Sequence, residues 1–195
     1  MNQKHNKEKV IQLGIQLFSG KGYNNVGLDE ICKTTGMTKG AFYNAFESKE
    51  NYLLETIYSF DQTNSARIIK MLTAKPGDKA IDLLKHFYTD MLNRQPKLNY
   101  MGCMINNMMS ELGALNEKVG NATKEGFTRI IESIEQTVLQ AQQEGDLTFD
   151  YTSKEIATLL HCTFYGVLTS AKSLNSNAQA LHTMNILFNT LTTKK

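Results

Sequence analysis

Apolar residues recur at intervals of three and four along almost the whole sequence, a spacing that places them on one face of an α-helix. Residues 7–19 show it first, with Val10, Leu13, Leu17 and Phe18 on one side. The chain of 195 residues has only two prolines and few runs of β-branched residues, so little in it interrupts helices or favours strands. We therefore predict an all-α protein.

Glycines and capping residues divide this pattern into separate helices. Gly20 and Gly22 end the first helix, Gly36 ends the second, and Thr38 can cap the third. The predicted helices cover residues 7–19, 28–35, 38–46, 48–72, 78–93, 103–112, 116–144, 153–174 and 177–192. We expect an N-terminal domain of short helices over residues 1–50 and a larger helical bundle over residues 51–195.

Composition excludes several classes of protein. The three cysteines, Cys32, Cys103 and Cys162, are too far apart for a disulfide framework or a structural zinc site, so we expect neither metal nor cofactor. A polar N-terminus and the lack of a long apolar segment predict a cytoplasmic protein with no membrane partner. No phosphate loop, metal motif or nucleophile–base set points to an enzyme, although a helical carrier or enzyme remains the alternative from another class.

The short helices show the spacing of a helix-turn-helix unit, in which a glycine-containing turn joins two short helices. Phe42 and Phe46 share one face of the third helix and can hold it against the first two. Lys39, Ala41 and Asn44 then lie outward or sideways, and these side chains can contact guanine, thymine and adenine in a major groove. The alternative is a small helical subdomain whose exposed polar residues contact only solvent.

Residues 18–53 closely resemble the N-terminal DNA-binding domain of the TetR/AcrR family of bacterial transcriptional regulators. The resemblance rests on Phe18, Gly22, Tyr23, Ile31, Gly36, Lys39, Gly40, Phe42, Tyr43, Phe46, Ser48, Lys49 and Glu50. It implies that Lys39, Gly40, Ala41 and Asn44 read bases, and that Tyr43 and Lys49 contact phosphates. With the capping residue Thr38, these seven positions form the predicted DNA-binding set. One departure is Val26–Gly27, where the family usually has Thr–Ser, so a capping and phosphate-contacting hydroxyl is missing.

The resemblance also implies that the remaining helices bind an effector and form a homodimer on double-stranded operator DNA. We therefore expect a ligand-responsive repressor that a small apolar or thiol-reactive effector releases from a palindromic operator. A transcriptional activator of the same family is the alternative.

A methionine-rich stretch, residues 100–113, is the first candidate for an effector site. Its Gly102–Cys103 start resembles a subgroup of the family in which some members respond to electrophiles or oxidants, and a thiol at a helix N-terminus favours the thiolate. The alternative is that Cys103 is a buried packing residue. The predicted ligand-binding set is Cys103, Met104, Met108, Phe87, Phe127, Phe164 and Tyr165.

The last two predicted helices each carry an apolar stripe. The residues that we predict at a dimer interface are Ile156, Leu160, Phe164, Val167, Leu181, Met184 and Phe188. If the bundle covers these stripes only in part, a twofold partner can bury the remainder, as two half-sites about one DNA turn apart require. The alternative is that both helices are internal core helices.

Overall fold

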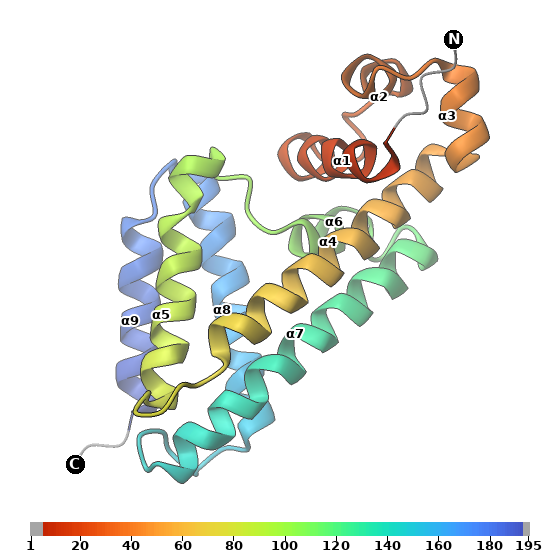
Figure 1. The fold of residues 1–195 in the computed structure, drawn as a ribbon. Coiled ribbons are helices and arrows are strands. Elements are labelled where there is room, and N and C mark those ends of the chain that lie inside the picture. The colour runs from red at the N-terminus through yellow and green to blue at the C-terminus, as the bar shows by residue number, and fades with distance from the viewer. Residues whose placement is uncertain (1–5, 193–195) are drawn as a thin grey trace. The chain divides into compact units, whose positions relative to one another are not determined.

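The computed structural model describes residues 6–192, and the secondary structure of this part is helical (Figure 1). The helices are α1 (Lys7–Lys21), α2 (Leu28–Thr35), α3 (Lys39–Phe46), α4 (Lys49–Leu72), α5 (Ala80–Asn93), the 3-10 helix η1 (Gln95–Leu98), α6 (Met104–Leu112), α7 (Glu117–Gln143), α8 (Ser153–Leu174) and α9 (Ala178–Leu191). The predicted all-α fold is confirmed.

Helix boundaries follow local capping chemistry. The Asn6 side chain accepts a hydrogen bond from the Lys9 amide at the start of α1, and Gly22 ends that helix with φ 79°. Thr152 and Glu155 form a capping box at the start of α8. The predicted helices leave residues 94–102 in a loop, and the structure places the 3-10 helix η1 within it. Pro96 lies in the first turn of this helix, where its missing N–H leaves no partner unsatisfied.

Backbone contacts divide the chain into two compact units. The first unit contains the residues up to Thr63 together with Cys103–Gly126, and the second contains Asn64–Gly102 and the chain from Phe127 onward. Both α4 and α7 therefore begin in the first unit and end in the second. The division at residue 50 that we expect for the DNA-binding domain stays a prediction about function.

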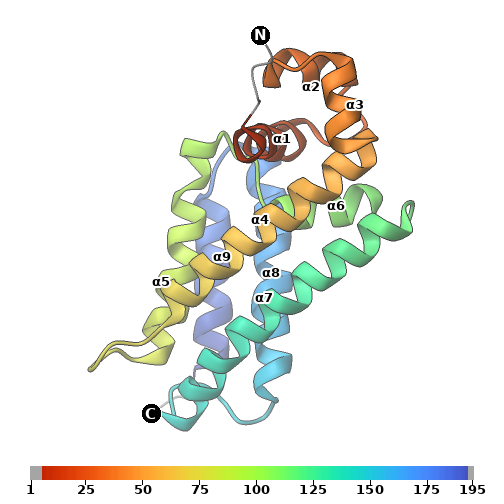
Figure 2. The same ribbon diagram turned by 45° about the vertical axis from the view of Figure 1, so that its right-hand side comes forward.

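In the first unit, α1, α2 and α3 gather at the N-terminal end of α4 (Figures 1 and 2). Their core is aromatic, because Phe18, Phe42 and Tyr52 are each fully buried. Gly14 allows α1 to approach α4, since a Cβ at this position would collide with the Tyr52 hydroxyl. That hydroxyl donates a 2.6 Å hydrogen bond to the carbonyl of Val10, which fixes the two helices together.

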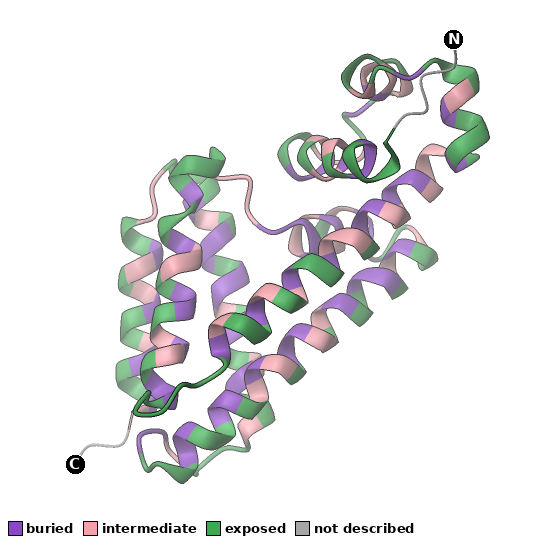
Figure 3. Ribbon diagram, viewed as in Figure 1, coloured by how far each residue is buried: buried purple, intermediate pink, exposed green. Residues whose placement is uncertain are grey.

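In the second unit, α5, α8 and α9 turn their buried faces toward one another (Figure 3). Leu84, Tyr88, Leu160, Phe164 and Phe188 all have 2% or less of their surface exposed. The side-chain amide of Asn177 also donates a hydrogen bond to the backbone carbonyl of Leu92, which ties the start of α9 to the end of α5.

Candidate DNA-binding interface

The turn between α2 and α3 has the geometry that a helix-turn-helix requires. Gly36 ends α2 with φ 72° and ψ 11°, a left-handed conformation that glycine adopts without steric penalty. Met37 is buried beneath the turn, and Thr38 starts α3 by accepting a 3.2 Å hydrogen bond from the Ala41 amide. The exposed Thr38 hydroxyl is therefore already committed to the helix cap.

The inner face of α3 is held by aromatic packing. The ring centroids of Phe42 and Phe46 lie 5.3 Å apart, and the Tyr52 ring lies 5.4 Å from the first and 4.7 Å from the second. Phe42 is fully buried and Phe46 is 2% exposed. The two residues do anchor the inner face of α3, but the ring they pack on is Tyr52 of α4, whereas the sequence predicted packing against the first two helices. The orientation of the opposite face follows from this packing.

The outer face of α3 is open. Lys39, Gly40, Tyr43 and Asn44 are exposed and Ala41 is half-buried, and a Cβ at Gly40 would meet no atom within 4 Å. The Lys39 ammonium lies 2.7 Å from a carboxylate oxygen of Asp29 on α2, and both side chains are mostly exposed. Because this ion pair is exposed, it adds little stability, and Lys39 can leave Asp29 to bind a phosphate or the edge of a guanine.

Lys49 lies differently from the rest of the predicted set. Its Nζ donates to the carbonyls of Tyr23 and Val26, at 3.0 and 2.9 Å, and lies 3.9 Å from the centroid of the Tyr23 ring. Burial lowers the pKa of this ammonium. Two of its three N–H groups thus bind the α1–α2 loop, and one is left for a phosphate oxygen. Sequence reasoning missed this positioning role.

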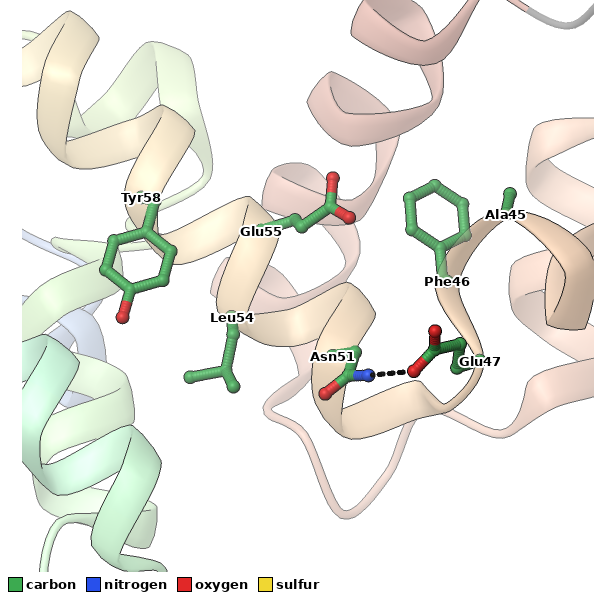
Figure 4. Close-up of a pocket in the computed structure, with 7 residues that line it drawn as sticks. All are labelled: Ala45, Phe46, Glu47, Asn51, Leu54, Glu55 and Tyr58. Atoms are coloured by element: carbon green, nitrogen blue, oxygen red, sulfur yellow. Dashed lines mark hydrogen bonds between the residues drawn. The ribbon is translucent and has the colours of Figure 1, made fainter.

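The C-terminal end of α3 has a different chemistry. A hollow of about 260 Å³ lies there, lined by Ala45, Phe46, Glu47, Asn51, Leu54, Glu55 and Tyr58 (Figure 4). Asn51 donates to Glu47 at 3.3 Å, and Glu55 pairs with Lys7 at 2.7 Å. Lys7 neutralises Glu55, and the carboxylate of Glu47, which is exposed at this end, repels phosphates, so electrostatics favour DNA contact through the N-terminal end of α3.

Helix α6 supplies contacts to the helix-turn-helix that sequence reasoning missed. The Glu111 carboxylate accepts hydrogen bonds from the amides of Tyr23 and Asn24, both at 2.9 Å. Asn107, one turn earlier, donates to the carbonyl of Ser19 at 3.1 Å. These partners lie 87 or 88 residues apart along the chain. No periodicity signals such a pairing, and only the fold brings the groups together.

Helix α2 starts without a side-chain cap, as the Val26–Gly27 departure predicts. Gly27 has φ −83° and ψ 160°, and a Cβ there would meet nothing within 4 Å. We expect Gly27→Ser to raise the free energy of unfolding by about 0.5–1 kcal/mol, because it adds a cap and restricts the unfolded chain. Thermal unfolding checks this, with Gly27→Ala as the control that lacks the hydroxyl. Equal stability of the two variants would show that no cap forms.

The predicted ligand-binding residues are divided between the two units. Cys103, Met104 and Met108 belong to the first unit, where Cys103 is the N-cap residue of α6 and 6% exposed, and both methionines are fully buried. In the second unit, Phe87 is fully buried, Phe164 and Tyr165 are nearly so, and Phe127 is half-buried. The rings of Phe127, Phe164 and Tyr165 lie around His161, a residue that is absent from the predicted ligand-binding set.

The predicted dimer residues mostly face the core of the second unit. Ile156, Leu160, Phe164, Val167, Met184 and Phe188 are buried within the unit, and Leu181 is half-buried. The outward sides of α8 and α9 instead expose Leu159 and Ile186, at 45% and 53%, and Gly166, whose added Cβ would meet nothing within 4 Å. These outward positions are the ones that a partner chain could reach.

Within residues 6–192, no group of three or more His, Cys, Asp and Glu side chains is placed to hold a metal ion. None of the helices in this range combines the length and the apolar character needed to cross a membrane.

Comparison with known proteins identifies the family. The model of bacterial regulatory proteins of the tetR family matches residues 10–56, and the model of the tetracyclin repressor-like C-terminal domain matches residues 80–187. The chain belongs to the TetR family. It is a DNA-binding transcriptional regulator and not an enzyme, which confirms the resemblance seen in residues 18–53. The narrower resemblance to a Gly–Cys subgroup stays a prediction.

Individual TetR-family relatives are similar to this protein along most of its chain. The HTH-type transcriptional repressor NemR of Escherichia coli K12 is 26% identical over 93% of both proteins. The HTH-type transcriptional repressor DhaR of Mycobacterium sp. strain GP1 is 22% identical over 85% of this chain and 82% of its own. A regulatory protein TetR from Rhodobacter sphaeroides shares the fold, with a TM-score of 0.86 and 24% identity over 96% of this chain and 98% of its own.

Proposed function

We propose that this TetR-family regulator is a ligand-responsive repressor that binds a palindromic operator as a homodimer in the cytoplasm. The observation that carries the proposal is the geometry of α3. Its inner face is locked by Phe42 and Phe46, while Lys39, Tyr43 and Asn44 stand exposed on the other face. The relatives NemR and DhaR are both named transcriptional repressors, which supports repression rather than activation.

The proposed base-reading residues are Lys39, Gly40, Ala41 and Asn44. Tyr43 and the remaining N–H of Lys49 would contact phosphates, which fix the position of the helix without reading sequence. The Thr38 hydroxyl holds the cap, and its exposure leaves it within the same surface. A second copy of α3 would enter the next major groove, about one DNA turn away.

The proposed dimer contact uses the outward sides of α8 and α9. Leu159 and Ile186 supply exposed apolar area, and Gly166 allows a partner helix to approach closely. The buried stripe from Ile156 to Val167 and from Leu181 to Phe188 would support these helices from inside. A twofold interface pairs the same surface of both copies and therefore forms a dimer, which matches the two half-sites of a palindrome.

The proposed effector site is the group of rings in the second unit. Phe87, Phe127, Phe164 and Tyr165 supply an apolar lining, and an effector that binds one dimer geometry better than another shifts the population toward it.

In the first unit, α6 carries Cys103 at one end and Glu111 at the other. A thiol-reactive effector at Cys103 stays the alternative route, since Glu111 passes any shift of α6 to the α1–α2 loop.

We expect Lys39→Ala and Tyr43→Phe each to weaken operator binding about five- to tenfold, because each loses a hydrogen bond to DNA. An operator selected from random DNA provides the probe, and fluorescence anisotropy gives the dissociation constant at several salt concentrations. A fall of about one in the salt slope of Lys39→Ala would show that Lys39 contacts a phosphate instead of the base edge proposed for it.

Lys97→Ala and Tyr151→Phe are the matched controls, because both residues are exposed in the second unit. They should bind DNA like the wild-type protein. If the α3 variants bind as tightly as these controls, the assignment of the DNA surface is wrong. If a reporter behind the selected operator becomes less active when the gene is deleted, the protein is an activator instead.

A further inference from the structure

Three polar atoms in the core of the second unit lack hydrogen-bond partners. They are Nδ1 and Nε2 of His161 on α8 and Oη of Tyr88 on α5, and none has a partner within the described residues. His161 is 2% exposed and Tyr88 is fully buried. Buried polar groups are nearly always paired, so three unpaired atoms on two neighbouring rings call for an explanation.

Aromatic rings surround these atoms. The centroid of the His161 ring lies 4.5 Å from Tyr165, 5.5 Å from Phe164, 6.1 Å from Phe127 and 6.2 Å from Tyr88. The Tyr88 ring also lies 5.2 Å from Phe164 and 6.0 Å from Phe188. Helices α5, α7, α8 and α9 each contribute at least one ring to this group. We call it the aromatic cage, and it consists of Tyr88, Phe127, His161, Phe164, Tyr165 and Phe188.

The aromatic cage offers hydrogen bonds without charge. Burial lowers the pKa of His161 to about 3, so its ring is neutral and presents one N–H donor and one bare nitrogen acceptor. Burial, and secondly the nearby Cys162 thiol, raise the pKa of Tyr88, which therefore keeps its proton. The cage thus presents two donors, the N–H of His161 and the O–H of Tyr88, and two acceptors, the bare nitrogen of His161 and the hydroxyl oxygen of Tyr88, among apolar rings.

We propose that the aromatic cage binds a small neutral phenol whose hydroxyl group hydrogen-bonds to both His161 and Tyr88. The phenol O–H would donate a hydrogen bond to the bare nitrogen of His161, and its oxygen would accept a hydrogen bond from the O–H of Tyr88. The ligand ring would pack against Phe127, Phe164 and Tyr165 in edge and offset contacts. This inference rests on the proposed function, because the cage contains Phe127, Phe164 and Tyr165 of the proposed effector site.

Other ligand chemistries fit less well. A pure hydrocarbon would leave all three polar atoms without partners, and a site built to hydrogen-bond an oxygen discriminates strongly against an analogue that lacks it. A carboxylate would bring a charge into a cage whose groups are neutral, where an ion has no counterion. A buried water could pair the same atoms, and the experiment below distinguishes it from a ligand.

Isothermal titration calorimetry with phenol, toluene and benzoate tests the proposal on the full-length protein. We expect phenol to bind at least about tenfold tighter than either analogue. His161→Leu and Tyr88→Phe should each weaken phenol binding about tenfold, because each removes one hydrogen-bonding partner. His86→Gln and Tyr151→Phe change an exposed histidine and an exposed tyrosine outside the cage and should bind phenol like the wild-type protein.

Unfolding without ligand separates a binding role from a structural one. If His161 and Tyr88 are kept for a ligand, His161→Leu and Tyr88→Phe should raise the midpoint of thermal unfolding by about 2–4 °C, since each removes unpaired buried polar atoms. If the two groups bind only an internal water, both variants should lower the midpoint and wild-type protein should bind phenol no tighter than toluene. That result would overturn the proposal.

The same titrations keep this inference separate from the proposed function. Binding of phenol that depends on His161 but leaves operator affinity unchanged would support the site and contradict release by this ligand. Operator release by phenol that is equal in His161→Leu, Tyr88→Phe and wild-type protein would contradict the site and leave the repressor function in place.

Discussion

Replacing Glu111 with alanine is expected to lower the free energy of unfolding by about 2–4 kcal/mol and to weaken operator binding at the same time. The Glu111 carboxylate accepts both the Tyr23 and the Asn24 amides at 2.9 Å, and hydrogen bonds to a charged group contribute about 1.5–3 kcal/mol each. Two such bonds would sum to about 3–6 kcal/mol, and because the carboxylate is only half-buried we expect the smaller loss of about 2–4 kcal/mol. Urea unfolding measures the loss, and anisotropy with the selected operator measures the DNA effect.

The same paired contact predicts a coupling with Gly22. A Cβ at Gly22 would lie 2.8 Å from the carboxylate oxygen of Glu111, and the φ of Gly22 is 79°. Gly22→Ala should therefore destabilise the wild-type protein more than it destabilises the Glu111→Ala variant, because the collision is absent in the second background. Ser110→Ala, an exposed change on the same helix, is the control and should leave stability within about 0.5 kcal/mol of wild type.

If Glu111→Ala unfolds at the same urea concentration as Ser110→Ala, the two hydrogen bonds do not hold the loop. If stability falls but operator affinity is unchanged, α6 supports the fold of the helix-turn-helix without setting its orientation on DNA. Only a loss of both would connect α6 to the DNA-binding surface in the way the proposed repressor mechanism requires.

The second large effect concerns acid stability and has His161 as its source. Its pKa is about 3 in the folded protein and about 6.5 in an unfolded chain. Below pH 6.5 the unfolded chain therefore takes up a proton that the folded protein does not. Stability then falls by about 1.4 kcal/mol per pH unit, or about 2 kcal/mol between pH 6.5 and 5, and the fall continues until about pH 3.

The measurement is urea unfolding at several pH values between 7.5 and 5. Carboxylates also titrate toward the acid end, so the informative quantity is the difference between wild-type protein and His161→Leu, in which their contributions cancel. We expect the variant to lose the slope that His161 adds, while His86→Gln, which changes an exposed histidine, keeps it. Parallel curves for wild type and His161→Leu would show that His161 takes up its proton in the folded state.

The local features of this protein follow from the sequence alone. Apolar spacing predicts each α-helix of the described chain within about two residues of its observed end, because an α-helix is defined by contacts over three and four residues. The Gly36 turn, the Thr38 cap and the Phe42–Phe46 face are local in the same sense, and all three are present. The resemblance in residues 18–53 adds the family for the same reason, since its motif is one continuous stretch.

What depends on distant contacts was decided only by the tertiary structure. An apolar stripe shows that one side of a helix is covered but does not show what covers it, and the stripes of α8 and α9 are covered by their own unit. Lys49 binds loop carbonyls and Glu111 binds amides 87 and 88 residues away, pairings that carry no sequence period. The burial of His161 likewise exists only once α5, α7 and α8 meet around it, because desolvation is a property of the packed surroundings and not of the residue.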